Sequence, residues 1–156
     1  MNTIVGKKAP EFRLQGSNGQ EVTLADFKGK HVVLYFYPKD MTPGCTTEAC
    51  DFRENHASFA ELDTMIVGVS ADPIDRHEKF KTKYELPFLL LSDPDHTLSE
   101  AYGCWVLKKN FGKEYMGIER STFVIDKEGN VVKEWRKVKV KGHVEEALSF
   151  IKNELQ

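Results

Sequence analysis

Apolar and polar residues along this chain follow two different periods, which predict strands and helices in turn. Residues 31–37 (HVVLYFY) and 64–70 (TMIVGVS) are nearly continuous apolar runs, typical of strands buried on both faces. Phe88 to Leu91 is a shorter run of the same kind. From Cys45 to about Leu62 the apolar period becomes helical, with a stripe made of Ala49, Phe52, His56, Phe59 and Ala60.

Turn residues and helix-start signals divide the rest of the chain. Ser17-Asn18-Gly19 and Lys127-Glu-Gly-Asn130 each separate two short apolar segments, and so predict hairpins over 12–24 and over 121–135. Asp72-Pro73 and Asp93-Pro94 each predict a helix start, with aspartate as the N-cap and proline as the first helical residue. The second of these helices stops at Gly103, and a last amphipathic helix is predicted over about 143–155.

This order of elements predicts the fold class. Strands alternate with helices and are followed by a closing hairpin and helix, which favours an α/β fold with a mixed central sheet flanked by helices. A strand, a cysteine-bearing helix, a second strand and a later hairpin and helix form the order of the thioredoxin-like fold, here with an N-terminal hairpin. No repeat or linker-like stretch divides residues 1–156, so we expect a single domain.

Composition excludes several classes of function. The 156 residues are 40% hydrophobic and 29% charged with a formal net charge of −2, which provides no global field to recruit nucleic acid or an anionic membrane. No apolar run approaches the roughly 18 residues of a membrane-spanning helix. The opening residues, MNTIVGKKAPEF, lack the apolar core of a signal peptide, so a cytoplasmic location is expected. Three cysteines are too few for a secreted disulfide framework and favour catalytic, redox or metal-binding roles.

Cys45 is the first candidate for chemistry because of its place in the pattern. The loop from Pro38 to Gly44 leaves a buried strand and delivers Cys45 to the first turn of a helix. Unpaired backbone N–H groups and the positive end of the helix dipole stabilise a thiolate there. Thr42 offers a hydroxyl to the same pocket, and Pro43 removes a backbone donor and stiffens the approach. Taken alone, this placement fits a merely buried cysteine equally well.

The wider motif resembles a known family. Pro38-x3-Thr42-x2-Cys45 is the signature of the peroxiredoxins, which the chain resembles over essentially its whole length. The segment Thr42-Pro-Gly-Cys-Thr-Thr-Glu-Ala-Cys50 is similar to the peroxiredoxin Q or bacterioferritin comigratory protein branch. Further similarities to that branch are Asp51-Phe-Arg53, Gly68-Val-Ser70, Tyr84-x2-Pro87-Phe88, Leu91-Ser-Asp93, Tyr102-Gly103 and Arg120-Ser-Thr-Phe-Val-Ile-Asp126.

The resemblance implies a thiol-dependent peroxidase that reduces hydrogen peroxide and organic hydroperoxides. Cys45 would be the peroxidatic thiol, Thr42 would hydrogen-bond the thiolate and peroxide oxygens, and Arg120 would stabilise the thiolate and the leaving oxygen. Attack on an O–O bond does need a thiolate and donors placed where charge develops, and a forked guanidinium suits that role better than a lysine. The remaining pocket residues would be Pro38, Pro43, Gly44 and Glu48. Glu48 either orients Arg120 or is a solvated carboxylate on the helix face.

The resemblance also implies a resolving step. The Cys45 sulfenic acid would condense with Cys50, and thioredoxin or a similar dithiol protein would reduce the disulfide. In an ideal helix, Cα atoms five residues apart are separated by about 8.7 Å, whereas a disulfide needs less than about 7 Å. The first helical turns must therefore unwind if Cys50 resolves. No metal, haem or flavin is expected, and the branch is often monomeric, so we expect a monomer.

Three further features of the sequence have alternative interpretations. Cys104 follows a helix stop and is interpreted as a spectator, with a minor candidacy for resolving Cys45. Cys45, Cys50 and His56 do not share one helical face, which disfavours a metal site. The basic run 133–141 (KEWRKVKVK) is interpreted as a solvated strand face rather than a nucleic-acid patch.

Two rival functions use the same cysteine. A thioredoxin-type disulfide reductase needs Cys-x-x-Cys, which the spacing of Cys45 and Cys50 does not supply. A non-enzymatic redox sensor or thiol chaperone would oxidise Cys45 without turnover. Excess reductant separates these possibilities, because an enzyme then consumes many equivalents of peroxide and a sensor only about one.

Overall fold

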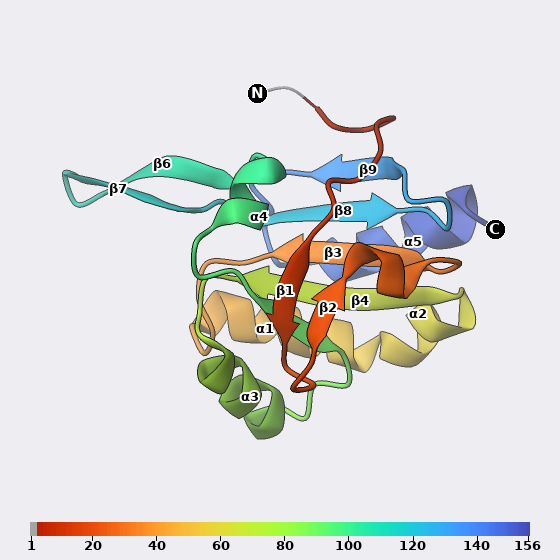
Figure 1. Cartoon of the computed structure of the whole chain (residues 1–156), viewed down its shortest axis with the longest axis horizontal. Helices are drawn as coiled ribbons and strands as arrows, with labels where there is room; N and C mark the ends of the chain where they lie inside the picture. The colour runs from red at the N-terminus through yellow and green to blue at the C-terminus, as the bar shows by residue number, and fades with distance from the viewer. Residues whose placement is uncertain (1–2) are drawn as a thin grey trace.

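The computed structural model describes residues 3–156 and confirms a mixed central sheet flanked by helices (Figure 1). Seven strands lie in the order β2-β1-β5-β4-β3-β8-β9. Strands β3, β4 and β5 are parallel to one another, whereas β1, β2, β8 and β9 join by antiparallel pairing. The bounds are β1 Arg13–Gly16, β2 Glu21–Thr23, β3 His31–Phe36, β4 Thr64–Ser70, β5 Leu89–Ser92, β8 Ser121–Ile125 and β9 Val131–Trp135.

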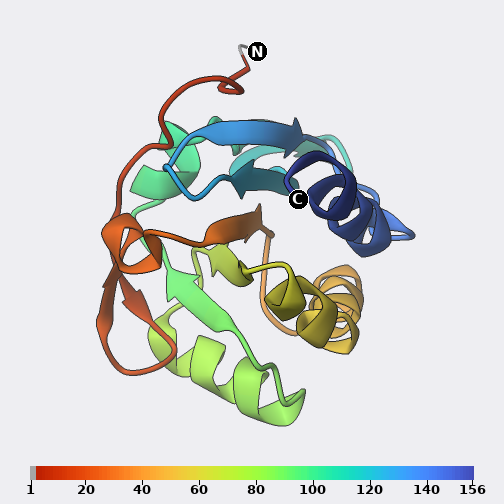
Figure 2. The same cartoon turned by 90° about the vertical axis from the view of Figure 1, so that its right-hand side faces the viewer.

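Helices cover both faces of this sheet. Their bounds are η1 Leu24–Phe27 (a 3-10 turn), α1 Pro43–Glu54, α2 His56–Glu61, α3 Ile74–Lys83, α4 Thr97–Ala101 and α5 His143–Glu154. Figure 2 shows α1, α2 and α5 on one side of the sheet, with η1 and α4 on the other. No helix within residues 3–156 combines the length and apolar character needed to cross a membrane.

The central strand β3 separates two apolar cores. Val33 and Tyr35 pack into the core beneath α1, α2, α3 and α5. Val32, Leu34 and Phe36 pack into the core beneath α4 and η1. Successive side chains of a strand point to opposite faces, so every residue of β3 is buried. Burial on both sides is the physical reason for the continuous apolar run in the sequence.

The predicted helix from Cys45 to Leu62 is wrong in one respect, because it is two helices. α1 ends at Glu54 and α2 begins at His56. Asn55 lies between them and donates from Nδ2 to the Asp51 carbonyl over 2.9 Å, and such local side-chain bonds compete with helix continuation. Ala60, predicted on the buried stripe, is exposed, because the break changes the phase of that stripe.

Both predicted aspartate–proline helix starts are displaced. α3 begins at Ile74 with Pro73 as its N-cap, so Asp72 is not the capping residue. α4 begins only at Thr97 and ends at Ala101, two residues before Gly103. Asp93 still serves α4, since its carboxylate accepts from the backbone N–H of Ser99 over 2.8 Å. Aspartate side chains can satisfy helix amides from a preceding turn, which local spacing alone does not locate.

A third hairpin, between the two that were predicted, was not foreseen from the sequence. β6 (Trp105–Asn110) and β7 (Lys113–Ile118) form a separate two-stranded sheet that projects from the body of the molecule (Figure 1). Most of its side chains are exposed, so the sequence lacks the alternation that marks a half-buried strand. The basic run also differs from expectation, because β9 ends at Trp135 and residues 136–141 contain no strand.

Candidate active site

Cys45 occupies the third position of α1 and is only 2% exposed. Thr42 is the N-cap of the helix and Pro43 is its first residue, where a missing N–H costs nothing. The first backbone bond of the helix runs from Thr46 N–H to the Thr42 carbonyl over 2.8 Å. The sulfur therefore lies in the turn where free N–H groups and the helix dipole favour negative charge.

Arg120 reaches this sulfur from the position just before strand β8. It precedes β8, and the antiparallel pairing of Ser121 with Phe36 sets it beyond the end of β3, beside the start of α1. Its Nη2 donates to Cys45 Sγ over 3.3 Å. Its Nη1 donates to Glu48 Oε1 over 2.6 Å. Cys45 and Glu48 are three residues apart on one helical face, so a single guanidinium bonds both side chains.

Electrostatics keep this guanidinium charged. Burial alone lowers the pKa of Arg120, but Glu48 and Cys45 outweigh it and raise that pKa above its ordinary value. Burial raises the pKa of Glu48 to about 7, although Arg120 partly opposes the change. The other carboxylate oxygen of Glu48, Oε2, is buried without a hydrogen-bond partner in the part of the chain that the structure describes. Glu48 is therefore a buried partner of Arg120 rather than a solvated carboxylate.

The other predicted pocket residues lie around the start of α1. The Thr42 hydroxyl donates to the Lys39 carbonyl over 2.8 Å, and no hydrogen bond joins Thr42 to Cys45 within residues 3–156. A Cβ at Gly44 would lie 3.1 Å from Arg120 Nη2, so glycine permits the close approach of the guanidinium. Pro38 and Pro43 are exposed at the two ends of the loop.

The three cysteines are free thiols in different settings. Cys50 is partly buried on the same intact helix as Cys45. Cys104 is fully buried in the core on the opposite face of the sheet from Cys45. Burial raises the pKa of Cys104 to about 12, against smaller opposing effects of Ser121 and Arg136. The sheet thus separates Cys104 from Cys45.

Sequence reasoning missed a polar cluster behind the loop. Tyr37, Asp40 and His77 are buried and hydrogen-bonded to one another. One signal was available in the sequence, because His77 lies three residues before Phe80 on the buried face of α3. A histidine on an apolar face needs buried partners for its ring nitrogens.

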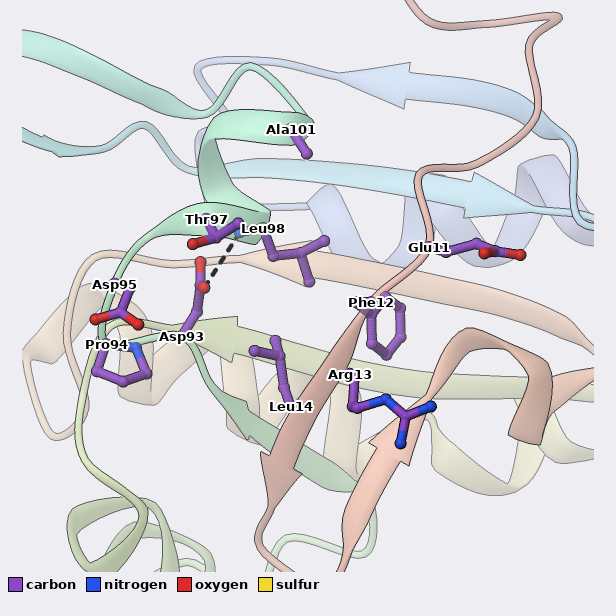
Figure 3. Close-up of a pocket in the computed structure, with 10 residues that line it drawn as sticks. All are labelled: Glu11, Phe12, Arg13, Leu14, Asp93, Pro94, Asp95, Thr97, Leu98 and Ala101. Atoms are coloured by element: carbon purple, nitrogen blue, oxygen red, sulfur yellow. Dashed lines mark hydrogen bonds between the residues drawn. The ribbon is translucent and has the colours of Figure 1, made fainter.

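A cavity of about 360 Å³ lies elsewhere, between β1 and α4 (Figure 3). Asp93 borders it, and the carboxylate of Asp93 is already bonded to the backbone of α4. Its walls contain no residue of the Cys45, Glu48 and Arg120 cluster, and consist of Glu11, Phe12, Arg13, Leu14, Asp93, Pro94, Asp95, Thr97, Leu98 and Ala101. The cavity is therefore separate from the thiol site.

Comparison with known proteins finds relatives that match nearly the whole chain. Residues 5–134 match the model of the AhpC/TSA family. Peroxiredoxin Bcp of Bacillus subtilis is 66% identical over 153 residues, which cover 98% of each chain. A peroxiredoxin Q structure from Xanthomonas campestris superposes with a TM-score of 0.89 at 43% identity, covering 93% of this chain and 92% of that one.

A second matching structure from Xanthomonas campestris concerns a protein with a named activity. It is a bacterioferritin comigratory protein studied for its alkyl peroxide reduction activity in trapped intermediate and ligand complexes. It matches with a TM-score of 0.89 at 42% identity, covering 93% of this chain and 92% of that one.

Proposed function

This chain belongs to the AhpC/TSA family and is a peroxiredoxin, a thiol-dependent peroxidase, and from this membership we propose that Cys45 is the thiol that attacks the hydroperoxide. One observation carries the assignment of the residue. Arg120 is bonded to Cys45 Sγ and to Glu48 at the same time, in a site that excludes bulk water from the sulfur. Neither of the other two cysteines is bonded to an arginine within residues 3–156.

The first chemical step is a displacement on oxygen. The Cys45 thiolate attacks the terminal oxygen of R–O–O–H, so that an S–O bond forms and the O–O bond breaks. Cys45 becomes a sulfenic acid, and the departing RO⁻ takes up a proton and leaves as an alcohol or, from hydrogen peroxide, as water. Arg120 provides donors where the negative charge moves from sulfur to the leaving oxygen.

Thr42 is the proposed acceptor for the hydroperoxide O–H. Its own hydrogen is bonded to the Lys39 carbonyl, which leaves the oxygen lone pairs free to accept. Gly44 supports this arrangement because its missing Cβ leaves room for Arg120. Pro38 and Pro43 then limit how far the loop can move at its two ends, since proline fixes φ.

The second step is resolution by Cys50. Its thiol attacks the Cys45 sulfenic sulfur, forming an S–S bond and releasing water. A dithiol reductant such as thioredoxin then restores both thiols by exchange. Cys104 is the weaker candidate, because it is fully buried on the opposite face of the sheet.

The substrate range and the oligomeric state are proposed from a relative's activity and from the make-up of the site. The alkyl peroxide reduction of the Xanthomonas relative supports organic hydroperoxides beside hydrogen peroxide as substrates here. We propose that the protein acts as a monomer, because one chain supplies the whole Cys45, Glu48 and Arg120 cluster. We propose a cytoplasmic location because that compartment keeps thiols such as Cys45 reduced.

Peroxide turnover under excess dithiothreitol tests this proposal. The wild-type protein is expected to consume many equivalents of hydrogen peroxide and of cumene hydroperoxide per chain. Cys45→Ser should consume none, and it serves as the matched control because it removes only the attacking sulfur. Consumption of about one equivalent by the wild type would instead identify a redox sensor without turnover.

A further inference from the structure

Asp40 is the most highly bonded residue of the loop that precedes Cys45, although none of its hydrogen bonds reaches Cys45 or Arg120. Its carboxylate accepts from the Tyr37 hydroxyl over 2.5 Å and lies 2.6 Å from His77 Nδ1. Its backbone N–H donates to Asp72 Oδ2 over 2.8 Å. Its carbonyl accepts from Arg76 Nη2 over 3.2 Å. All of its backbone and side-chain polar groups are therefore engaged.

His77 links this loop to the sheet. Its ring is fully buried, and its Nε2 lies 2.8 Å from the Leu91 carbonyl of β5. A carbonyl only accepts, so Nε2 carries a hydrogen, while Nδ1 faces the Asp40 carboxylate. Tyr37 completes the cluster as a donor, because burial, and then Asp40, raise its pKa well above the ordinary value and keep its hydroxyl protonated.

The same cluster has the spacing of a cation site but not the free ligands. The ligand-type atoms of Asp40, Asp72 and His77 lie within 4.8 Å of one another. Asp72 Oδ2 already accepts from the Ser70 hydroxyl over 2.6 Å and from the Asp40 backbone. Since each of these side chains has a protein partner, the cluster is a closed hydrogen-bond network.

The network fixes the chain immediately before α1. Met41, the next residue, has φ of 65°, a left-handed conformation that a non-glycine residue keeps only when its surroundings impose it. Thr42 follows, with its side chain bonded to the Lys39 carbonyl and its own carbonyl accepting the first helical bond from Thr46. Asp40 thus sets the direction from which α1, and with it Cys45, begins.

None of the bonds made by Asp40 involves α1. Its partners are Tyr37, Asp72, Arg76 and His77, which lie in the loops and in α3. Unwinding of α1 leaves every one of these contacts available. The network can therefore stay closed while the helix that carries Cys45 opens.

We propose that Asp40 and His77 are positioning residues that hold the start of α1 in register with Arg120, and that they stay paired while α1 unwinds for the disulfide. The helix then rewinds from an unchanged start after each reduction. The persistence of the Asp40–His77 pair during unwinding rests on the proposed function, because only a Cys45–Cys50 disulfide requires the unwinding.

Two substitutions of His77 separate positioning from packing. The side-chain amide of His77→Asn takes the place of Nδ1 and can hydrogen-bond the Asp40 carboxyl group as donor or as acceptor. The amide nitrogen of His77→Gln corresponds to Nε2, and so can reach Leu91 but not Asp40. His31→Gln is the control, since His31 is also buried and lies at the far end of β3 from the loop.

The first measurement is the second-order rate constant of Cys45 oxidation by hydrogen peroxide. His77→Gln should reduce it by roughly 10- to 100-fold, the penalty of a misplaced reacting group. His77→Asn should recover most of that loss, and His31→Gln should keep the wild-type rate. Equal losses in both His77 variants, or a wild-type rate in His77→Gln, would overturn the positioning role. If neither His77 variant folds, Tyr37→Phe decides, and its unchanged rate would overturn the role.

The second measurement is amide hydrogen exchange by NMR. In reduced His77→Gln, the Thr46 amide should exchange faster than in His77→Asn. In oxidised wild type, the Asp40 amide should keep the protection that it has in the reduced form. Loss of that protection would reject the persistent anchor. A wild type that does not react with peroxide would reject the proposed function instead, while the reduced-state exchange still tests the anchor.

Discussion

Arg120 Nη2 lies 3.3 Å from Cys45 Sγ, so a residue at the edge of β8 completes a site that α1 begins 75 positions earlier. The second arm of the same guanidinium is held by Glu48 over 2.6 Å. A planar fork with several donors can bond both partners at once, whereas an ammonium is a point charge that cannot keep both bonds in one geometry.

Arg120→Lys is predicted to lower the rate constant of Cys45 oxidation by about 100-fold or more, the typical loss for one donor at a developing negative charge. Stopped-flow measurement with hydrogen peroxide checks this. Arg136→Lys is the matched control, because Arg136 bonds Glu134 and the Tyr102 carbonyl away from Cys45 and should keep the wild-type rate. An unchanged rate in a folded Arg120→Lys protein would remove Arg120 from the site.

Glu48 is predicted to make the protein less stable as pH rises from about 5 to 7. The unfolded chain loses the Glu48 proton near pKa 4.5, whereas burial holds it in the folded state to a pKa of about 7. The folded state therefore binds more protons in this window, and the free energy of unfolding falls by up to about 1.4 kcal/mol per pH unit. Glu48→Gln should abolish this contribution.

Urea unfolding at several pH values gives the free energy of unfolding of the wild type and of Glu48→Gln. The difference between the two proteins at each pH isolates the contribution of Glu48. The comparison is needed because burial lowers the pKa of His143 to about 4, from an ordinary 6.5. Between those values the unfolded state binds the extra proton, so His143 adds stability as pH rises. Parallel stability–pH curves for the two proteins would contradict the raised pKa of Glu48.

Cys50→Ser and Cys104→Ser are predicted to behave differently. With a dithiol protein such as thioredoxin as reductant, Cys50→Ser should stop at the Cys45 sulfenic acid and lose turnover. Cys104→Ser should keep turnover, because Cys104 is buried on the other face of the sheet and its pKa is raised to about 12. Mass spectrometry of the oxidised proteins identifies the joined cysteines. The reverse pattern would make Cys104 the resolving thiol.

Oxidation is predicted to unwind the first turns of α1. A Cys45–Cys50 disulfide does not fit a helix, in which the two Cα atoms are about 8.7 Å apart. The amides of residues 45–52 should therefore lose protection from hydrogen exchange when the protein is oxidised. Equal protection of these amides in reduced and oxidised protein would exclude Cys50 as the partner.

The same experiment has an internal control in α2. Phe59 of α2 is fully buried, and the two helices are already separated at Asn55. Amides of α2 should keep their protection, because opening of a helix end costs less than opening of the packed core. Loss of protection throughout α2 would indicate a wider unfolding than the disulfide requires.

The local pattern of apolar residues was sufficient to predict most strands of the central sheet. Every residue of β3 is buried between two apolar layers, so the demand for apolar side chains appears directly as an unbroken run in the sequence. The β6 and β7 hairpin was missed for the opposite reason. Its side chains are mostly exposed, and exposure places little constraint on residue type.

The local pattern was not sufficient to predict where the helices begin. Both aspartate–proline pairs indicated nearby helices, but Asp72 is bonded to Ser70 and Asp40 instead of capping α3. An aspartate side chain has several competing partners of similar strength. Which partner the aspartate bonds depends on the groups that the fold brings near it, and local sequence does not determine those groups.

The sequence by itself determined where the reactive cysteine stands, because a buried strand, a turn-rich loop and Pro43 put Cys45 in the first turn of a helix through local preferences alone. The resemblance to peroxiredoxins pointed to Arg120, but no periodicity did. Only the tertiary structure decided that Arg120 bonds Cys45 and Glu48, that Cys104 lies on the far face, and that His77 holds Asp40. These contacts join residues far apart in the chain, and their geometry depends on strand order and register, which local patterns of apolar residues do not encode.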